Sequence, residues 1–140
     1  MNRTQIRLVQ ASFEAVARQR NRTTAIFLAQ LFVREPALSA VFRGELRAQA
    51  ASLHSALAEI VPSLDRLYPI VPALEWLGVR AARCGVGFRQ YDAVEGAMLA
   101  ALADTLGDGF TDALRGAWKA AFRRVAGIMI AASELEPLAA

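Results

Sequence analysis

Apolar residues recur every three or four positions along almost the whole of this chain. In the last long stretch, the residues that share one helical face are Leu114, Trp118, Phe122, Val125 and Met129. This spacing places side chains on one side of an α-helix, whereas a half-buried strand needs strict alternation, which we do not find. With 140 residues, 55% of them hydrophobic, the chain is expected to form one all-α domain spanning residues 1–140.

Breaks in the apolar pattern divide the chain into six or seven helical segments. The helices are predicted at residues 4–18, 23–33 and 45–61, and around Leu77, Val94 and Phe122. A short helical turn is expected from Pro36 to Phe42. Residues 20–22 are expected to separate the first two helices, and the tail from Ser133 is expected to fray.

Charge and composition argue against several classes of partner. The net charge of +3 comes almost wholly from arginines scattered along the chain, without interleaved aromatic residues, so no nucleic-acid binding is expected. The apolar run Val125–Ala132 is far shorter than the ~20 residues that cross a bilayer, so no membrane association is expected. A single cysteine and the lack of a secretory signal indicate a cytoplasmic protein.

Several segments are more specific than a helical pattern. The stretch Phe27–Phe32, continuing through Pro36 to Phe42, resembles the second and third helices of single-domain bacterial haemoglobins and of the globin domain of flavohaemoglobins. Leu106–Thr111, followed by Ala117 and Trp118, resembles the junction before their last helix. The resemblance covers roughly residues 6–132. It implies a globin fold, with six to eight helices in a 3-on-3 sandwich, related to the phycobiliproteins.

The resemblance also implies roles for single residues. Phe42 matches the phenylalanine that stacks against haem, Gln49 matches the distal glutamine, and Leu53 matches the leucine one turn later. Tyr91 matches a tyrosine on the proximal side of the haem. At the place of the histidine that binds the haem iron, however, this chain carries Ala81. An alanine has no lone pair to donate, so ordinary haem and oxygen binding is not expected.

Other departures point the same way. Leu28 stands where the family carries a distal tyrosine, and Ser133 falls near the place of a glutamate found in flavohaemoglobins. The pocket lining itself is retained. The residues expected to line it are Phe27, Leu28, Phe42, Gln49, Leu53, Leu77, Arg80, Ala81, Cys84, Val86, Tyr91, Val94 and Met98.

Few side chains could replace the missing histidine. His54 follows Leu53, which turns it ~100° away from the pocket and toward neighbouring helices. Cys84, one turn beyond Ala81, is either a small apolar filler or a thiol that could attach a linear tetrapyrrole. Three arginines either meet ligand propionates or solvate an outer face: Arg80, Arg83 and Arg89. Both tryptophans, Trp76 and Trp118, are expected to pack in the core.

These observations leave three functions open. The first is a carrier or storage protein for an iron-free linear tetrapyrrole, a bilin such as biliverdin, as the resemblance to haem-less globins associated with bilin synthesis implies. The second is a haem-free globin that acts as a sensor or protein-interaction domain, with a homodimer as one form. The third is a haem globin with an unusual axial ligand. No catalytic residues, metal-ligand cluster or nucleotide-binding motif are evident, so the protein is not expected to be an enzyme.

Overall fold

A computed structural model describes residues 1–39 and 46–139 of the chain, and in them it contains helices and no strands. The α-helices are α1 (Arg3–Arg18), α2 (Arg20–Arg34), α3 (Leu46–Ile60), α4 (Val71–Arg83), α5 (Phe88–Leu106) and α6 (Asp112–Ala139). Short 3-10 turns join them, at η1 (Pro36–Ser39), η2 (Val61–Ser63), η3 (Tyr68–Ile70) and η4 (Gly107–Gly109). The predicted all-α class is confirmed.

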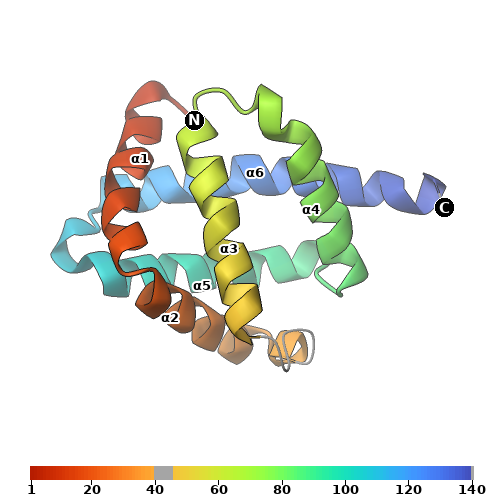
Figure 1. The fold of residues 1–140 in the computed structure, drawn as a ribbon, viewed down its shortest axis with the longest axis horizontal. Coiled ribbons are helices and arrows are strands. Elements are labelled where there is room, and N and C mark those ends of the chain that lie inside the picture. The colour runs from red at the N-terminus through yellow and green to blue at the C-terminus, as the bar shows by residue number, and fades with distance from the viewer. Residues whose placement is uncertain (40–45, 140) are drawn as a thin grey trace.

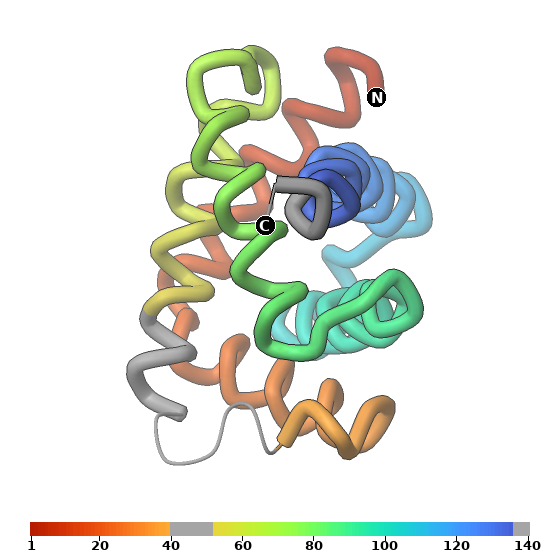
Figure 2. Tube along the Cα trace, turned by 90° about the vertical axis from the view of Figure 1, so that its right-hand side faces the viewer, coloured from red at the N-terminus to blue at the C-terminus, as the bar shows by residue number. Residues whose placement is uncertain are grey.

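The helices lie in two layers. Figure 1 shows α3 and α4 in front of α5 and α6, and in the turned view of Figure 2, α5 and α6 lie almost end-on to the right of α3 and α4. The most extensive contacts are those of α4 with α6 and of α2 with α5. None of the helices in the described part of the chain combines the length and the apolar character needed to cross a bilayer.

The core consists of two apolar clusters. The larger cluster joins α1, α4, α5 and α6 through buried residues that include Val9, Leu74, Leu102 and Trp118. The smaller cluster is centred on Leu31, Leu38 and Ala97, with partly buried neighbours at Phe27, Phe32, Val86, Ala93 and Val94. Helix α5 contributes to both clusters, and it therefore forms the boundary between them.

A backbone contact sets the position of α4 on α6. A Cβ atom placed on Gly78 would lie 2.2 Å from the carbonyl oxygen of Met129, which is closer than real Cβ atoms come to other heavy atoms. Any side chain larger than hydrogen at this position would force the two helices apart. Gly78 is therefore required for the α4–α6 contact.

Two helix ends differ from the sequence prediction. Residues 20–22 do not separate the first helices: α2 begins at Arg20, and the break is confined to Gln19. Arginine is a good helix former, and Arg22 is also held by a 2.8 Å ion pair with Asp104 on α5. At the other end of the chain, α6 continues to Ala139 instead of fraying from Ser133, since Ala132 is still buried against the fold.

Candidate functional site

Residue 81 lies in the last turn of α4, where a Schellman motif ends the helix. The backbone N–H of Val86 donates to the carbonyl of Ala81 at 2.9 Å, and that of Gly85 donates to Ala82 at 3.0 Å. Gly85 takes the positive φ of +95° that this motif requires and that glycine adopts without strain. The motif ties Val86 to Ala81, so both residues belong to the corner between α4 and α5.

The face of α4 that carries Ala81 runs from the core to the surface. Leu74 is buried in the larger cluster, Leu77 is half-buried against it, Ala81 is half-buried, and Cys84 is exposed at the C-cap. Position 81 therefore does not lie on the outer surface of the helix. A histidine here would have reached inward, and in its place the chain has a methyl group.

The predicted apolar lining residues divide between the two clusters. Phe27, Val86 and Val94 pack on the smaller cluster, whereas Leu77 and Met98 pack on the larger one. These five apolar side chains all remain partly exposed, unlike the buried residues of the two clusters. We call these five side chains the apolar wall, and none of them is fully covered by the described residues.

Two further lining predictions fall on α2 and α3, and the side chains of two others lie outside the described residues. Leu28 on α2 is buried, and Leu53 on α3 is half-buried. Phe42 lies outside the described residues, as does the side chain of Gln49. The distal part of the predicted pocket is therefore represented here by Leu28 and Leu53.

Tyr91 is the polar group of this region. It lies in the first turn of α5, only 8% of it is exposed, and its ring packs 6.5 Å from that of Phe122 on α6. Its hydroxyl is buried and has no hydrogen-bond partner among the described residues. Burial raises the pKa of this phenol above its ordinary value, so the group stays protonated and remains a donor. An unpartnered buried hydroxyl is rare in folded proteins.

His54, the single histidine of the chain, is engaged elsewhere. Its ring stacks on Phe13 of α1, with centroids 5.7 Å apart and an angle of 19° between the planes. Burial, and secondly the charge of Arg20, lower the pKa of this histidine, so the neutral form is favoured. Its place on α3 predicts this orientation toward a neighbouring helix. The chain therefore has no histidine to offer to the inner face of α4.

The residues present do not fit an axial bond from α4 to haem iron. Ala81 supplies no lone pair, and His54 lies against α1. Cys84 is an exposed thiol at the C-cap, and the buried phenol of Tyr91 is held in its protonated form. In the described part of the chain, no three His, Cys, Asp or Glu residues are grouped to hold a metal ion.

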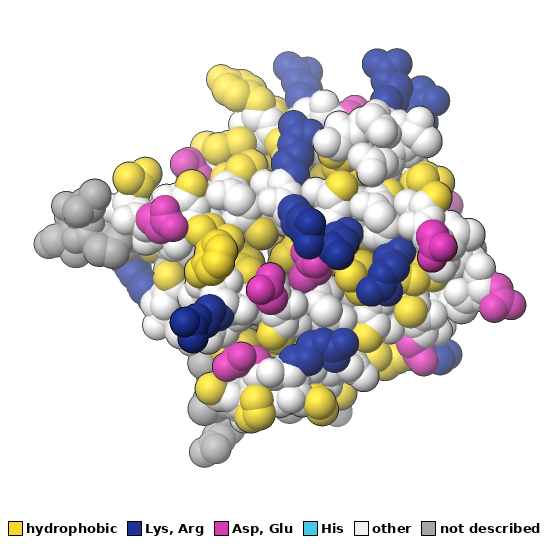
Figure 3. All heavy atoms as spheres, turned by 180° about the vertical axis from the view of Figure 1, so that it is seen from behind, with side chains coloured by type: hydrophobic (Ala, Val, Ile, Leu, Met, Phe, Trp, Pro, Cys, Tyr) yellow, Lys and Arg dark blue, Asp and Glu magenta, His cyan; other side chains and the backbone are white. Residues whose placement is uncertain are grey.

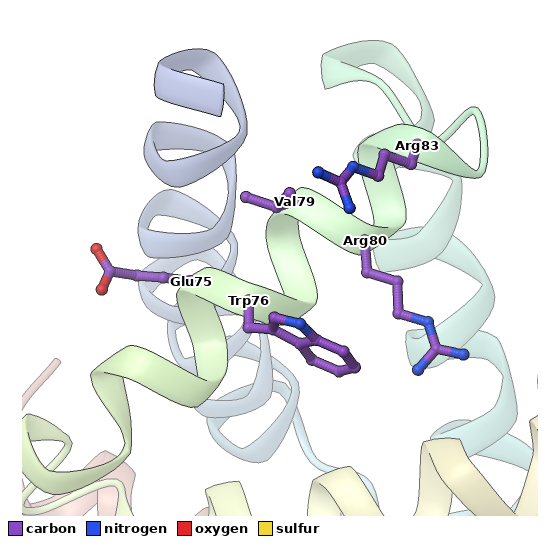
Figure 4. Close-up of a pocket in the computed structure, with 5 residues that line it drawn as sticks. All are labelled: Glu75, Trp76, Val79, Arg80 and Arg83. Carbon is purple, nitrogen blue, oxygen red and sulfur yellow. The ribbon is translucent and has the colours of Figure 1, made fainter. Parts of the chain in front are cut away.

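The arginines near the end of α4 are placed on its outer side. Arg80 is exposed, and its guanidinium lies 5.2 Å from the centroid of the Trp76 ring, a cation–π contact. Figure 4 shows the indole of Trp76 and the side chain of Arg80 next to one another, along a surface hollow that is completed by Glu75, Val79 and Arg83. Arg83 and Arg89 are also exposed.

This hollow corrects one prediction. Trp118 is buried, as expected for a packing residue, but Trp76 is 59% exposed and does not pack in the core. The physical reason is its position: five residues before Ala81, it is rotated by about 140° from the inner face of α4. The run of Glu75, Trp76, Val79, Arg80 and Arg83 at helical spacing carries the signal for a second face, which sequence reasoning missed.

The surface over α5 and α6 mixes charges of both signs. Glu95 accepts hydrogen bonds from Arg123, the shorter at 3.2 Å, and its carboxylate lies 4.0 Å from Lys119. Seen from this side, basic side chains form a band with acidic ones among them (Figure 3). Part of the basic charge on this face is therefore neutralised within the molecule.

Comparisons with known proteins agree with this architecture. The family model described as Globin matches residues 25–129 of the chain. An engineered carbene transferase from Rhodothermus marinus, made from a protein named as a nitric oxide dioxygenase, superposes with a TM-score of 0.89 at 24% identity, covering 99% of this chain and 97% of that one. A bacterial globin from Campylobacter jejuni superposes with a TM-score of 0.84 at 18% identity, covering 95% and 96%. At these identities the two structures support the fold alone, while the family model spans most of the chain, which therefore belongs to the globin family.

Proposed function

We propose that this globin binds an iron-free linear tetrapyrrole, such as biliverdin, along the apolar boundary between α2, α4 and α5, and that it acts as a non-enzymatic carrier or storage protein. One observation carries the proposal: Ala81 lies on the inner face of α4, and the only histidine of the chain is stacked against Phe13 on α1. Globins ordinarily hold haem by apolar burial, propionate contacts and an imidazole. In this chain the apolar side chains predicted to line the pocket are present, whereas the methyl group of Ala81 stands at the place of the imidazole.

The apolar wall supports a flat, largely hydrophobic ligand. Phe27, Leu77, Val86, Val94 and Met98 are partly exposed in the chain alone. Covering such surface stabilises a complex by roughly 25 cal/mol for each Å² of apolar area removed from water. A bilin gains this term without needing an iron ligand, whereas haem would forgo its bond to an imidazole. Without the imidazole, haem has no iron bond to add to this apolar term, and this supports an iron-free pigment as the ligand.

The direct test is a titration of the purified protein with biliverdin. We expect a saturable, red-shifted change of the pigment's absorption, with an affinity higher than that for hemin under the same conditions. Spectra that stay unchanged at micromolar protein would contradict the proposal. So would hemin that stays bound through gel filtration and is lost in Cys84→Ala or His54→Ala, since that result would establish a haem globin with an unusual axial ligand.

A gain-of-function variant tests the role of position 81. We expect Ala81→His to acquire stable hemin binding with a sharpened Soret band, because the Schellman motif already holds this residue in the last turn of α4. The matched control is Ala82→His, which adds the same imidazole at the exposed neighbouring position. Equal hemin binding by both variants and the unchanged protein would show that residue 81 does not decide the ligand.

The outer hollow of α4 favours a second candidate, a haem-free globin that pairs with another copy of itself. Trp76 is largely exposed, and the same hollow carries an acidic residue, Glu75, and a basic one, Arg80. A two-fold contact brings the same patch of both copies together. Sedimentation of the protein and of Trp76→Ala distinguishes the candidates. A dimer that dissociates in the variant while biliverdin has no effect on either protein would favour this alternative.

A further inference from the structure

We infer that the hydroxyl of Tyr91 is the polar anchor of the pocket and donates a hydrogen bond to an oxygen of the bound pigment, a terminal lactam carbonyl. This inference rests on the proposed function and names the group that would orient the ligand. It starts from a buried hydroxyl that has no partner within residues 1–39 and 46–139.

Other buried donors in this protein are partnered. The indole N–H of Trp118 donates to the hydroxyl of Ser12 at 2.9 Å, and the hydroxyls of Thr23 and Thr105 lie 2.6 Å apart. Among the described residues, the hydroxyl of Tyr91 is the buried side-chain polar atom that lacks a partner. A phenylalanine would fill the same space without an unused donor. The hydroxyl is therefore better explained by a partner from outside the chain than by packing.

The position of Tyr91 on α5 directs it to the proposed pocket. Residues 91, 94 and 98 follow one another at spacings of three and four, so Tyr91 shares a face of the helix with Val94 and Met98. Both of these residues belong to the apolar boundary. Tyr91 also follows directly on the corner where Val86 is bonded to Ala81. The donor thus lies on α5 shortly after the corner that holds Ala81 and Val86.

The ring is held rigidly, as an anchor requires. Phe122 packs against it from α6 with the ring planes inclined by 52°. The first turn of α5 is fixed by a cap in which the backbone N–H of Gly87 donates to the side-chain oxygen of Gln90 at 2.8 Å. A donor fixed in this way loses little conformational freedom on binding, and its direction selects one orientation of the ligand.

The chemistry of the donor points to a neutral oxygen. A protonated phenol donates one hydrogen bond, and burial keeps the group protonated. A carboxylate brought to a buried position needs a cation to offset its lost hydration, whereas an amide-type carbonyl needs only the hydrogen bond. Linear tetrapyrroles carry such carbonyls on their terminal rings, and cyclic porphyrins lack them. Tyr91 therefore also discriminates between open-chain and closed tetrapyrroles.

The experiment compares Tyr91→Phe with Tyr68→Phe, which removes the same hydroxyl from a side chain that is 83% exposed. Absorption titrations with biliverdin and with its dimethyl ester are recorded for both variants and for the unchanged protein. We expect Tyr91→Phe to weaken binding of both pigments by about tenfold, the effect of one lost hydrogen bond, and Tyr68→Phe to leave it unchanged. In infrared difference spectra, the lactam carbonyl band of the bound pigment should shift in Tyr91→Phe alone.

The outcomes separate this inference from the proposed function. Unchanged affinity and an unchanged carbonyl band in Tyr91→Phe, with tight binding by the parent protein, would overturn the anchor and leave the proposed function standing. A loss of affinity with biliverdin but not with its dimethyl ester would also overturn it, because the acceptor would then be a propionate. No pigment binding by the parent protein would overturn both.

Discussion

Two buried aromatic donors in this globin have opposite surroundings. At the junction of α1 and α6, Trp118 is 2% exposed, its N–H is bonded to Ser12, and Ser12 in turn donates to the carbonyl of Val9 at 2.9 Å. Around α5, Tyr91 is almost equally buried, but its hydroxyl has no partner among the described residues. The hydrogen bond of Trp118 stabilises the fold, whereas the hydroxyl of Tyr91 is where we propose that the ligand binds.

The side chains that pack around Trp118 and around Tyr91 also differ. Phe13 packs between His54 and Trp118, so an aromatic row closes the first junction with ring separations of 5.7 and 6.5 Å. The ring of Tyr91 packs against Phe122, and the next residue on the same face of α5 is the partly exposed Val94. In the first region the buried donor has its acceptor, whereas among the described residues the second has no acceptor for the hydroxyl of Tyr91 and no full cover for Val94.

The largest expected effect is the loss of the tryptophan. Trp118→Ala removes a fully buried indole from the larger cluster, and we expect the free energy of unfolding to fall by about 3–5 kcal/mol. Denaturant unfolding followed by circular dichroism measures it. Trp76→Ala is the control, because the exposed indole on α4 should change stability by less than about 0.5 kcal/mol. Similar losses in both variants would break the proposed contrast between the two tryptophans.

The hydrogen bond of the first junction is tested separately. Ser12→Ala leaves the buried N–H of Trp118 without an acceptor, and it should destabilise the protein by about 1–3 kcal/mol. Ser133→Ala is the matched control, since the hydroxyl of Ser133 also donates to a carbonyl three residues earlier, that of Ile130, and receives no indole. If the two variants had nearly equal free energies of unfolding, Trp118 would be held by packing alone.

Substitution of Tyr91 should change the free energy of unfolding in the opposite direction. In the ligand-free protein, Tyr91→Phe removes a donor that is already unsatisfied, so the free energy of unfolding should stay constant or rise by up to about 1 kcal/mol. The same thermal or denaturant measurement detects this. A clear destabilisation would show that the hydroxyl has a partner within the folded chain and would remove the contrast with Trp118.

The smallest expected effect is a pH dependence of the first junction. The pKa of His54 is lower in the folded chain than its ordinary value near about 6.5, so the unfolded chain binds a proton first as the pH falls. The stability that comes from the neutral ring is present above that pH and is lost as the pH falls through the folded value. His54→Phe keeps the stacking and should flatten this part of the profile, measured from about pH 7.5 to about pH 5. An unchanged slope would assign the pH dependence to other groups.

Much of the fold follows from local sequence signals. The apolar stripes locate the six α-helices of the described residues, and Gly85 ends α4 because it supplies the positive φ of the terminal motif. The start of α2 at Arg20 and the extension of α6 depend on contacts with distant residues, such as the pair of Arg22 with Asp104. Local patterns do not contain that information.

In the candidate site, too, some features follow from the sequence and others depend on contacts between distant residues. The sequence places Ala81 and Tyr91 in the right corner, but it does not show that the hydroxyl of Tyr91 lacks a partner, since this depends on what α6 brings near it. The exposure of Trp76 and its contact with Arg80 were also not predicted, because amino-acid type suggests burial and only the rotation of α4 on α6 decides it.

That rotation depends on Gly78. Because its hydrogen faces the carbonyl of Met129 directly, no side chain lies between the two helix backbones to take up a displacement by changing rotamer. A ligand that displaced α4 would therefore move α6 as well, because the two helix backbones are in direct contact at Gly78 and Met129.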